Sequence, residues 1–142
     1  MFDENRLKHT LAVAELMKRN AAALRLDAEE MFVLGFLHDV GHGLTDTNHE
    51  ELAGEVLEQQ SYKYAQEVAN HGKTETAYHS PALDLLNWCD MHTDMDGKYI
   101  SFERRLENIA KKYGESSVVY KNAKKLVETL QNKPNLFKLS VK

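Results

Sequence analysis

The chain has 142 residues, 42% of them hydrophobic, which is the size and composition of one globular domain. Its longest apolar run, residues 31 to 37, is far too short to cross a bilayer, and the N-terminus shows no export signal. The single Cys89 excludes an internal disulfide and a zinc site built from cysteines. We therefore expect one cytoplasmic domain over residues 1 to 142.

Charge is distributed unevenly along the chain, although the net charge is only −4. Residues 1 to 97 contain 7 lysines and arginines against 18 acidic residues, whereas residues 98 to 142 contain 11 against 4. All seven histidines lie in the acidic part. An acidic, histidine-rich segment suits cations and a basic segment suits phosphate groups, but solvated helix faces would give the same pattern.

Apolar residues recur at helical spacing along most of the chain, and no segment shows the strict alternation of a strand. Capping residues mark helix starts, as at Asp27 with Glu30 three positions later, and at Ser80 before a proline. Glycines mark helix ends, as at Gly72 and Gly114. The sequence predicts a single all-α bundle of six to seven helices, at about residues 3–23, 27–37, 47–60, 62–70, 81–90, 101–113 and 116–132.

The predicted helices at the two ends of the chain are amphipathic. The first places His9 on the face of Val13 and Leu16, so this histidine should point inward. The last is expected to bury Val119 on its apolar face and to leave its lysines in solvent.

Six polar residues occupy, or adjoin, the inward faces of separate predicted helices: His9, His38, Asp39, His49, His71 and Asp90. A single histidine on an apolar face is more often a hydrogen-bonded core residue, and for each one alone that interpretation stays open. Imidazole and carboxylate groups are also ligands of first-row metals. One shared metal centre explains all six placements together.

The pair His38-Asp39 ends the apolar helical run, and two glycines follow it. The last turn of a helix carries partial negative charge and attracts a cation. Gly35 lies one turn earlier on the same face and leaves room there, at a cost in helix propensity of roughly 1 kcal/mol. A surface aspartate beside a core histidine is the alternative for an isolated pair of this kind.

The order of these residues resembles the HD superfamily of metal-dependent phosphohydrolases, all-helical proteins named for their adjacent His-Asp pair. The resemblance covers about residues 5–115, and its second motif matches "LHDVGH". A later segment, which often carries a His-His pair, is similar to "EVANHGK", with Asn70 in the first place. One bacterial branch of small HD proteins has a stretch similar to "CDMHTDMDGKYISFERRLENIAKKYG", with an arginine that matches Arg105.

The resemblance implies that the metal ligands are His9, His38, Asp39 and Asp90, with His49 and His71 able to complete a second ion or a richer single site. It also implies hydrolysis of a phosphate ester or anhydride by metal-activated water.

The chemistry of the residues suggests further roles around this site. Asp39 would bridge two ions or orient the water. His42 would touch the substrate or act as an acid, and a solvent-facing loop histidine is the equal alternative. Arg105, then Lys98 and Arg104, would hold phosphate, unless they lie on a solvated helix face.

The expected cofactor is one or two divalent ions per chain, with iron or manganese favoured and cobalt, zinc, magnesium or nickel compatible. The expected partner is a small phosphorylated substrate, with a nucleotide favoured. A catalytically weak sensor that binds metal and nucleotide is the first alternative. A nucleic-acid-binding domain is the second, although no recognition motif is present. The sequence indicates no membrane partner and leaves a homodimer open.

Overall fold

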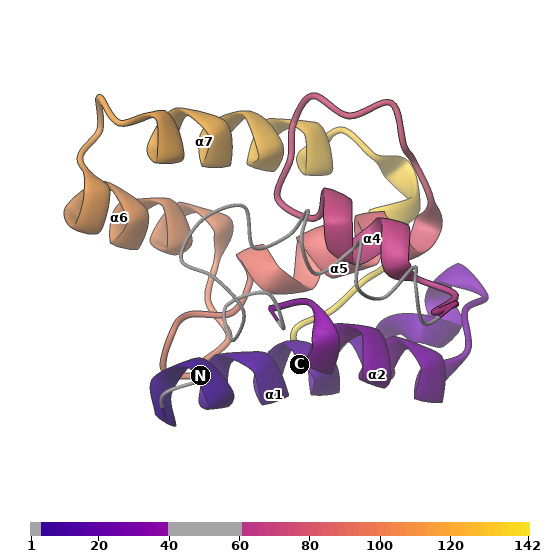
Figure 1. Cartoon of the computed structure of the whole chain (residues 1–142). Helices are drawn as coiled ribbons and strands as arrows, with labels where there is room; N and C mark the ends of the chain where they lie inside the picture. The colour runs from indigo at the N-terminus through magenta and orange to yellow at the C-terminus, as the bar shows by residue number, and fades with distance from the viewer. Residues whose placement is uncertain (1–3, 40–60) are drawn as a thin grey trace.

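The computed structural model describes residues 4–39 and 61–142. Three predictions lie outside these residues: the helix at 47–60, its His49, and the role of His42. The described residues form six α-helices and two 3-10 helices and contain no strand (Figure 1). They are α1 (Glu4–Asn20), η1 (Ala21–Leu24), α2 (Ala28–Leu37), α4 (Ala65–Asn70), α5 (Pro81–Met91), α6 (Phe102–Tyr113), α7 (Val118–Gln131) and η3 (Pro134–Leu136). The all-α prediction is confirmed.

Side-chain caps fix four of the helix starts. The side chains of Asp27, Ser80, Ser101 and Ser117 each accept a hydrogen bond from the backbone N–H three residues later, at 2.9–3.1 Å. The predicted Asp-x-x-Glu box at α2 is only half formed. The carboxylate of Glu30 instead accepts hydrogen bonds from the Tyr64 hydroxyl, at 2.6 Å, and the Lys63 ammonium, at 3.0 Å. This carboxylate therefore ties α2 to the chain that precedes α4.

Helices α1 and α2 lie side by side and form one layer of the molecule (Figure 1). Their close approach depends on Gly35, where an added Cβ would lie 2.6 Å from the Cα of Ala14. We expected the missing side chain to leave room for a site, but α1 occupies that room.

Helix α5 lies between this layer and the pair of helices α6 and α7 (Figure 1). Its Leu85 and Leu86 are fully buried, and its face packs against α1, α4 and α7. Complete burial of a leucine side chain contributes about 1.5–3 kcal/mol. The packing fixes α5 in the middle of the core and carries its C-terminal end toward the ends of α2 and α4.

Helix α7 buries a different set of residues from the one expected. Val119 is 46% exposed, so the prediction that it is buried is wrong. The helix begins at Val118, and its buried residues start only at Ala123 and continue with Leu126, Val127 and Leu130. None of the helices in the described ranges combines the length and apolarity that crossing a membrane requires.

Candidate metal centre

Five of the predicted ligand residues converge, one from within α1 and four from the C-terminal ends of α2, α4 and α5. His9 lies in the first half of α1, and His38 and Asp39 directly follow α2. His71 directly follows α4, and Asp90 is the penultimate residue of α5. His9, His38 and Asp39 are almost completely buried, with exposed fractions of 2%, 1% and 8%. Four separate segments therefore bring imidazole and carboxylate groups to one buried place.

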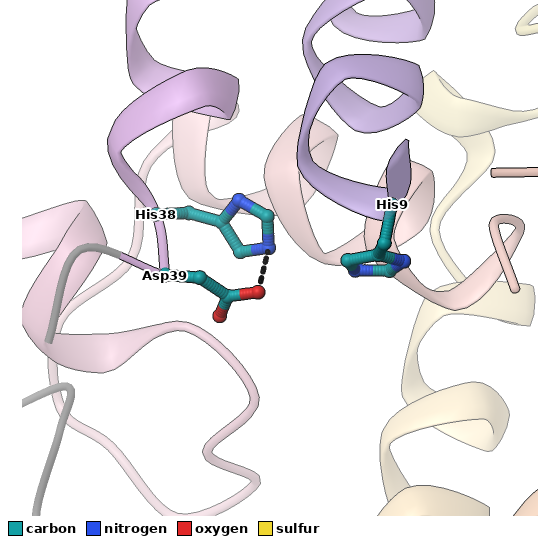
Figure 2. A group of neighbouring side chains, drawn as sticks. All are labelled: His9, His38 and Asp39. Atoms are coloured by element: carbon teal, nitrogen blue, oxygen red, sulfur yellow. Dashed lines mark ion pairs between the residues drawn. The ribbon is translucent and has the colours of Figure 1, made fainter. Parts of the chain in front are cut away.

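The donor atoms form a continuous chain of short contacts. Nε2 of His9 lies 2.7 Å from Oδ1 of Asp90, and this oxygen lies 3.4 Å from Nε2 of His38. Nε2 of His38 lies 3.3 Å from Oδ2 of Asp39, and Oδ1 of Asp39 lies 3.7 Å from Nε2 of His71. Figure 2 shows three of these residues, with His9 facing the pair at the end of α2.

All three histidines are oriented in the same way by the backbone. Nδ1 of His9 donates to the carbonyl of Asp94 at 2.9 Å, that of His38 to Gly35 at 2.6 Å, and that of His71 to Val68 at 2.7 Å. A carbonyl acceptor at Nδ1 fixes the tautomer and leaves Nε2 free to bind a cation.

The local fold explains two of these bonds. His38 and His71 each follow the last residue of a helix, where the final carbonyls have no partner within the helix. Each ring folds back onto the carbonyl three residues earlier, at Gly35 and Val68 respectively. This hydrogen bond gives a donor to one of the unpaired carbonyls at the helix end, and Nε2 of the ring points away from the helix.

The residues present fit a divalent metal ion. Nε2 of His38 is buried and has no hydrogen-bond partner in the part of the chain that the structure describes. One donor atom each from His9, His38 and Asp39 lies within 4.8 Å of the others. Two donors that share an ion about 2.1 Å away lie roughly 3–4 Å apart, which is the range of most of the contacts above. A cation held by these donors would bind Nε2 of His38 directly.

The electrostatics of the cluster also favour a cation. Burial opposes the charged form of His38, but Asp39, Asp90 and the Gly35 carbonyl outweigh it and raise the pKa of His38 to about 9. Burial likewise opposes ionisation of both carboxyls, but His38 with His71 lowers the pKa of Asp39, and His38 with His9 lowers that of Asp90. The carboxylates of Asp39, which is buried, and of Asp90, which is partly exposed, therefore favour the ionised form, and in the metal-free protein the proton of His38 offsets part of their charge. A metal ion would replace that proton.

The side chain of Asn70 makes hydrogen bonds within its own segment of the chain. Its amide nitrogen donates to the carbonyl of Gln66 at 2.8 Å, and its amide oxygen accepts from the Thr76 hydroxyl at 2.7 Å. The next residue, His71, supplies the ring that reaches Asp39.

The three predicted phosphate-binding residues are not part of this cluster. Lys98 is exposed on the turn between α5 and α6. Arg104 and Arg105 line a cavity of about 490 Å³ that none of the five clustered residues lines. The structure therefore separates these arginines from the clustered imidazoles and carboxylates.

Two residues of the site were not predicted from the sequence. Nη1 of Arg6 lies 3.6 Å from Oδ2 of Asp39, and its position one helical turn before His9 was a signal that could have been used. Asp94 contributes its backbone carbonyl to His9, and its carboxylate accepts the N–H groups of Asp96 and Lys98 at 2.9 Å each. The contact between Asp94 and His9 is made by a backbone carbonyl, so the side-chain pattern of the sequence could not predict it.

Comparison with known proteins agrees with this geometry. A family model described as "HD domain" matches residues 6–135, a range that contains all five clustered residues. Neither the curated proteins nor the solved structures gave a match. The family match covers well over half of the chain. The chain therefore belongs to the HD-domain superfamily of metal-dependent phosphohydrolases.

Proposed function

We propose that this protein hydrolyses a phosphate ester or anhydride of a small phosphorylated metabolite, with a nucleotide as the favoured substrate. One observation supports the proposal above the others: the Nε2 atoms of three histidines face the carboxylates of Asp39 and Asp90, and one of these nitrogens, in His38, has no hydrogen-bond partner among the described residues. Family membership supports the same reaction class.

His9, His38, Asp39 and Asp90 would hold the ion, and His71 adjoins them through Asp39. A divalent ion bound there lowers the pKa of water toward neutrality and offsets charge on a phosphoryl oxygen. One oxygen of Asp90 contacts the imidazoles of both His9 and His38, so Asp90 would join these two proposed ligands at the ion. Asp39 contacts His38 through one oxygen and His71 through the other, and it stays ionised, so it can accept a hydrogen bond from water and orient it.

Arg6 adds a positive charge next to Asp39 at this centre. Its guanidinium is partly exposed and lies 3.6 Å from Asp39, on the same helix as His9. A guanidinium in this place can contact an oxygen of a bound phosphate while Asp39 holds its position.

The test is a phosphate-release screen with nucleotides and other phosphoesters, supplying iron, manganese, cobalt, zinc, magnesium or nickel in turn. Asp39→Ala is the inactive reference, and His79→Ala is the matched control because His79 is exposed and outside the cluster. We expect at least one metal to support turnover in the wild type and in His79→Ala, but not in Asp39→Ala. If the wild type releases no more phosphate than Asp39→Ala with any of the metals, the protein is not a hydrolase for these substrates, and the sensor alternative is favoured.

A further inference from the structure

A second feature with the chemistry of a binding site lies beside the metal centre. A cavity of about 490 Å³ is bounded by the turn at residues 94–96, by helix α6 and by the start of α7. Its polar wall contains Arg104, Arg105, Asn108 and Lys112. Three of these four side chains are cationic, and the fourth is an amide that can donate two hydrogen bonds.

The lining of this cavity also contains two carboxylates, Asp94 and Asp96, but neither pairs with its cations within the part of the chain that the structure describes. None of Arg104, Arg105 and Lys112 forms an ion pair within 4 Å with any residue that the structure describes. Nε of Arg105 is buried without a hydrogen-bond partner in the same part of the chain. Asp94 lines the cavity too, but one of its carboxylate oxygens accepts two backbone N–H groups of its own turn. A buried donor without an acceptor is costly, and an anion would supply the acceptor.

The sequence of α6 builds this wall by helical spacing. Arg104, Asn108 and Lys112 are four residues apart and therefore share one stripe of the helix. The apolar part of the lining includes Tyr113, which follows Lys112 on α6, and Val119, and these two are 49% and 46% exposed. This position explains why Val119 does not enter the core. The ammonium of Lys112 lies 5.3 Å from the centre of the Tyr113 ring. A ring and a branched aliphatic side chain beside three cations suit a ligand with a flat or apolar part and an anionic part.

The cavity and the metal centre are connected through a single turn. Asp94 lines the cavity, and its carbonyl accepts the hydrogen bond that orients His9. The turn is pressed against α1, since a Cβ on Gly97, at φ +81°, would lie 2.8 Å from the carbonyl oxygen of Lys8. The arginines are thus placed across this turn from the ligand histidine.

We propose that this cavity binds a phosphate group of a nucleotide-sized ligand through Arg105, Arg104 and Lys112, with the apolar part of the ligand against Tyr113 and Val119. Two sources share this chemistry: the far end of the substrate, which would then carry a phosphate besides the reacting one, and a separate nucleotide that regulates the centre through Asp94 and His9. The substrate assignment rests on the proposed function, whereas the binding itself does not.

Binding is tested by calorimetric titration of inorganic pyrophosphate and of ADP into the full-length, metal-free chain at physiological salt. Lys112→Ala is the informative variant, because this lysine is exposed and its truncation leaves the core intact. Lys111→Ala is the matched control: it is the adjacent exposed lysine of α6 and does not line this cavity. We expect Kd to rise about tenfold in Lys112→Ala and in Arg105→Ala and to stay within about twofold in Lys111→Ala.

Two outcomes would overturn the proposal. One is no binding of either probe to the wild type. The other is an equal effect of Lys111→Ala and Lys112→Ala, which would show that only the overall charge of α6 matters. Far-ultraviolet circular dichroism of Arg105→Ala separates lost binding from lost folding. Binding should also persist in His38→Ala, because that side chain does not line the cavity.

Kinetics on the metal-loaded enzyme distinguish the two sources. If the cavity takes the far end of the substrate, Lys112→Ala raises KM for a nucleoside diphosphate more than for a small phosphate monoester. If it takes a regulator, pyrophosphate changes the rate of monoester hydrolysis in the wild type, and this effect is lost in Lys112→Ala. Absence of turnover with every metal would contradict the proposed function and leave the binding result standing.

Discussion

Gly35 and Ala14 hold the two principal helices of the metal centre at a fixed separation. The Cα of Ala14 lies only 2.6 Å from the place where a side chain at residue 35 would begin, and the sulfur of Met17 lies 3.0 Å from it. At this separation the rings of His9 and His38 have their centroids 5.7 Å apart. The same Gly35 also supplies the carbonyl that orients His38.

We expect Gly35→Ala to destabilise the protein and weaken metal binding. The new Cβ meets the backbone of Ala14, which cannot rotate away, so overpacking should cost about 1–3 kcal/mol or more. This exceeds the gain in helix propensity of roughly 1 kcal/mol. Urea unfolding measures the change, and Val33→Ala, at a 45% exposed position of the same helix, is the control. Equal stability of wild type and Gly35→Ala would show that the helices separate freely.

The local features of the fold could be predicted from the sequence because their causes are local. Caps at Asp27 and Ser80 and the stops at Gly72 and Gly114 depend on residues close in sequence, and all four occur as expected. The expectation that Gly35 leaves room for a site was wrong. Its space is filled by Ala14 of α1, and the packing of one helix on another cannot be read from the spacing within either helix.

In the candidate site, too, the sequence predicted some features and could not predict others. Inward helical spacing placed His9, His71 and Asp90 near the His-Asp pair, and the structure brings them together. Charge and side-chain type pointed to phosphate binding at Arg105, but they could not tell which side of the turn at Asp94 the guanidinium occupies. That position depends on how α6 packs after the turn.

Truncation of the His-Asp pair should remove the metal. We expect His38→Ala and Asp39→Ala each to lose bound metal, because each takes away a donor in contact with the others. Both variants should also lose the stabilisation that added metal gives the wild type, since metal binding is linked to folding. Elemental analysis and thermal unfolding with and without metal check this, with His79→Ala as the histidine control. Wild-type metal content in both variants would refute the ligand assignment.

The metal-free protein should lose stability as the solution becomes alkaline. The pKa of His38 is raised from 6.5 in the unfolded chain to about 9, so its stabilising effect is complete below about pH 6.5 and disappears as the pH rises through about 9. Urea unfolding with a chelator at several values between pH 6 and 9.5 measures the slope. His38→Gln should flatten it. A slope unchanged by this substitution would assign the titration to another group.

Metal affinity should change in the opposite direction over the same range. A cation must displace the proton from His38, so binding should tighten as the pH rises toward 9. Titration of manganese into metal-free protein at several pH values tests this. Affinity independent of pH would show that His38 is already deprotonated before the ion arrives.

The number of ions per chain is the last prediction. One ion needs only His9, His38, Asp39 and Asp90, whereas two ions roughly 3.5–4 Å apart need a bridging carboxylate and further ligands beyond it. Asp39 has one oxygen near His38 and the other near His71, which is the arrangement that a bridge requires. His49, which lies outside the described residues, is the further ligand expected from the sequence. We therefore expect a stoichiometry near two in protein purified anaerobically with iron or manganese, and a decrease toward one in His71→Ala and in His49→Ala. A wild-type value near one that neither substitution changes would make the centre mononuclear and leave His71 as a neighbour that orients Asp39.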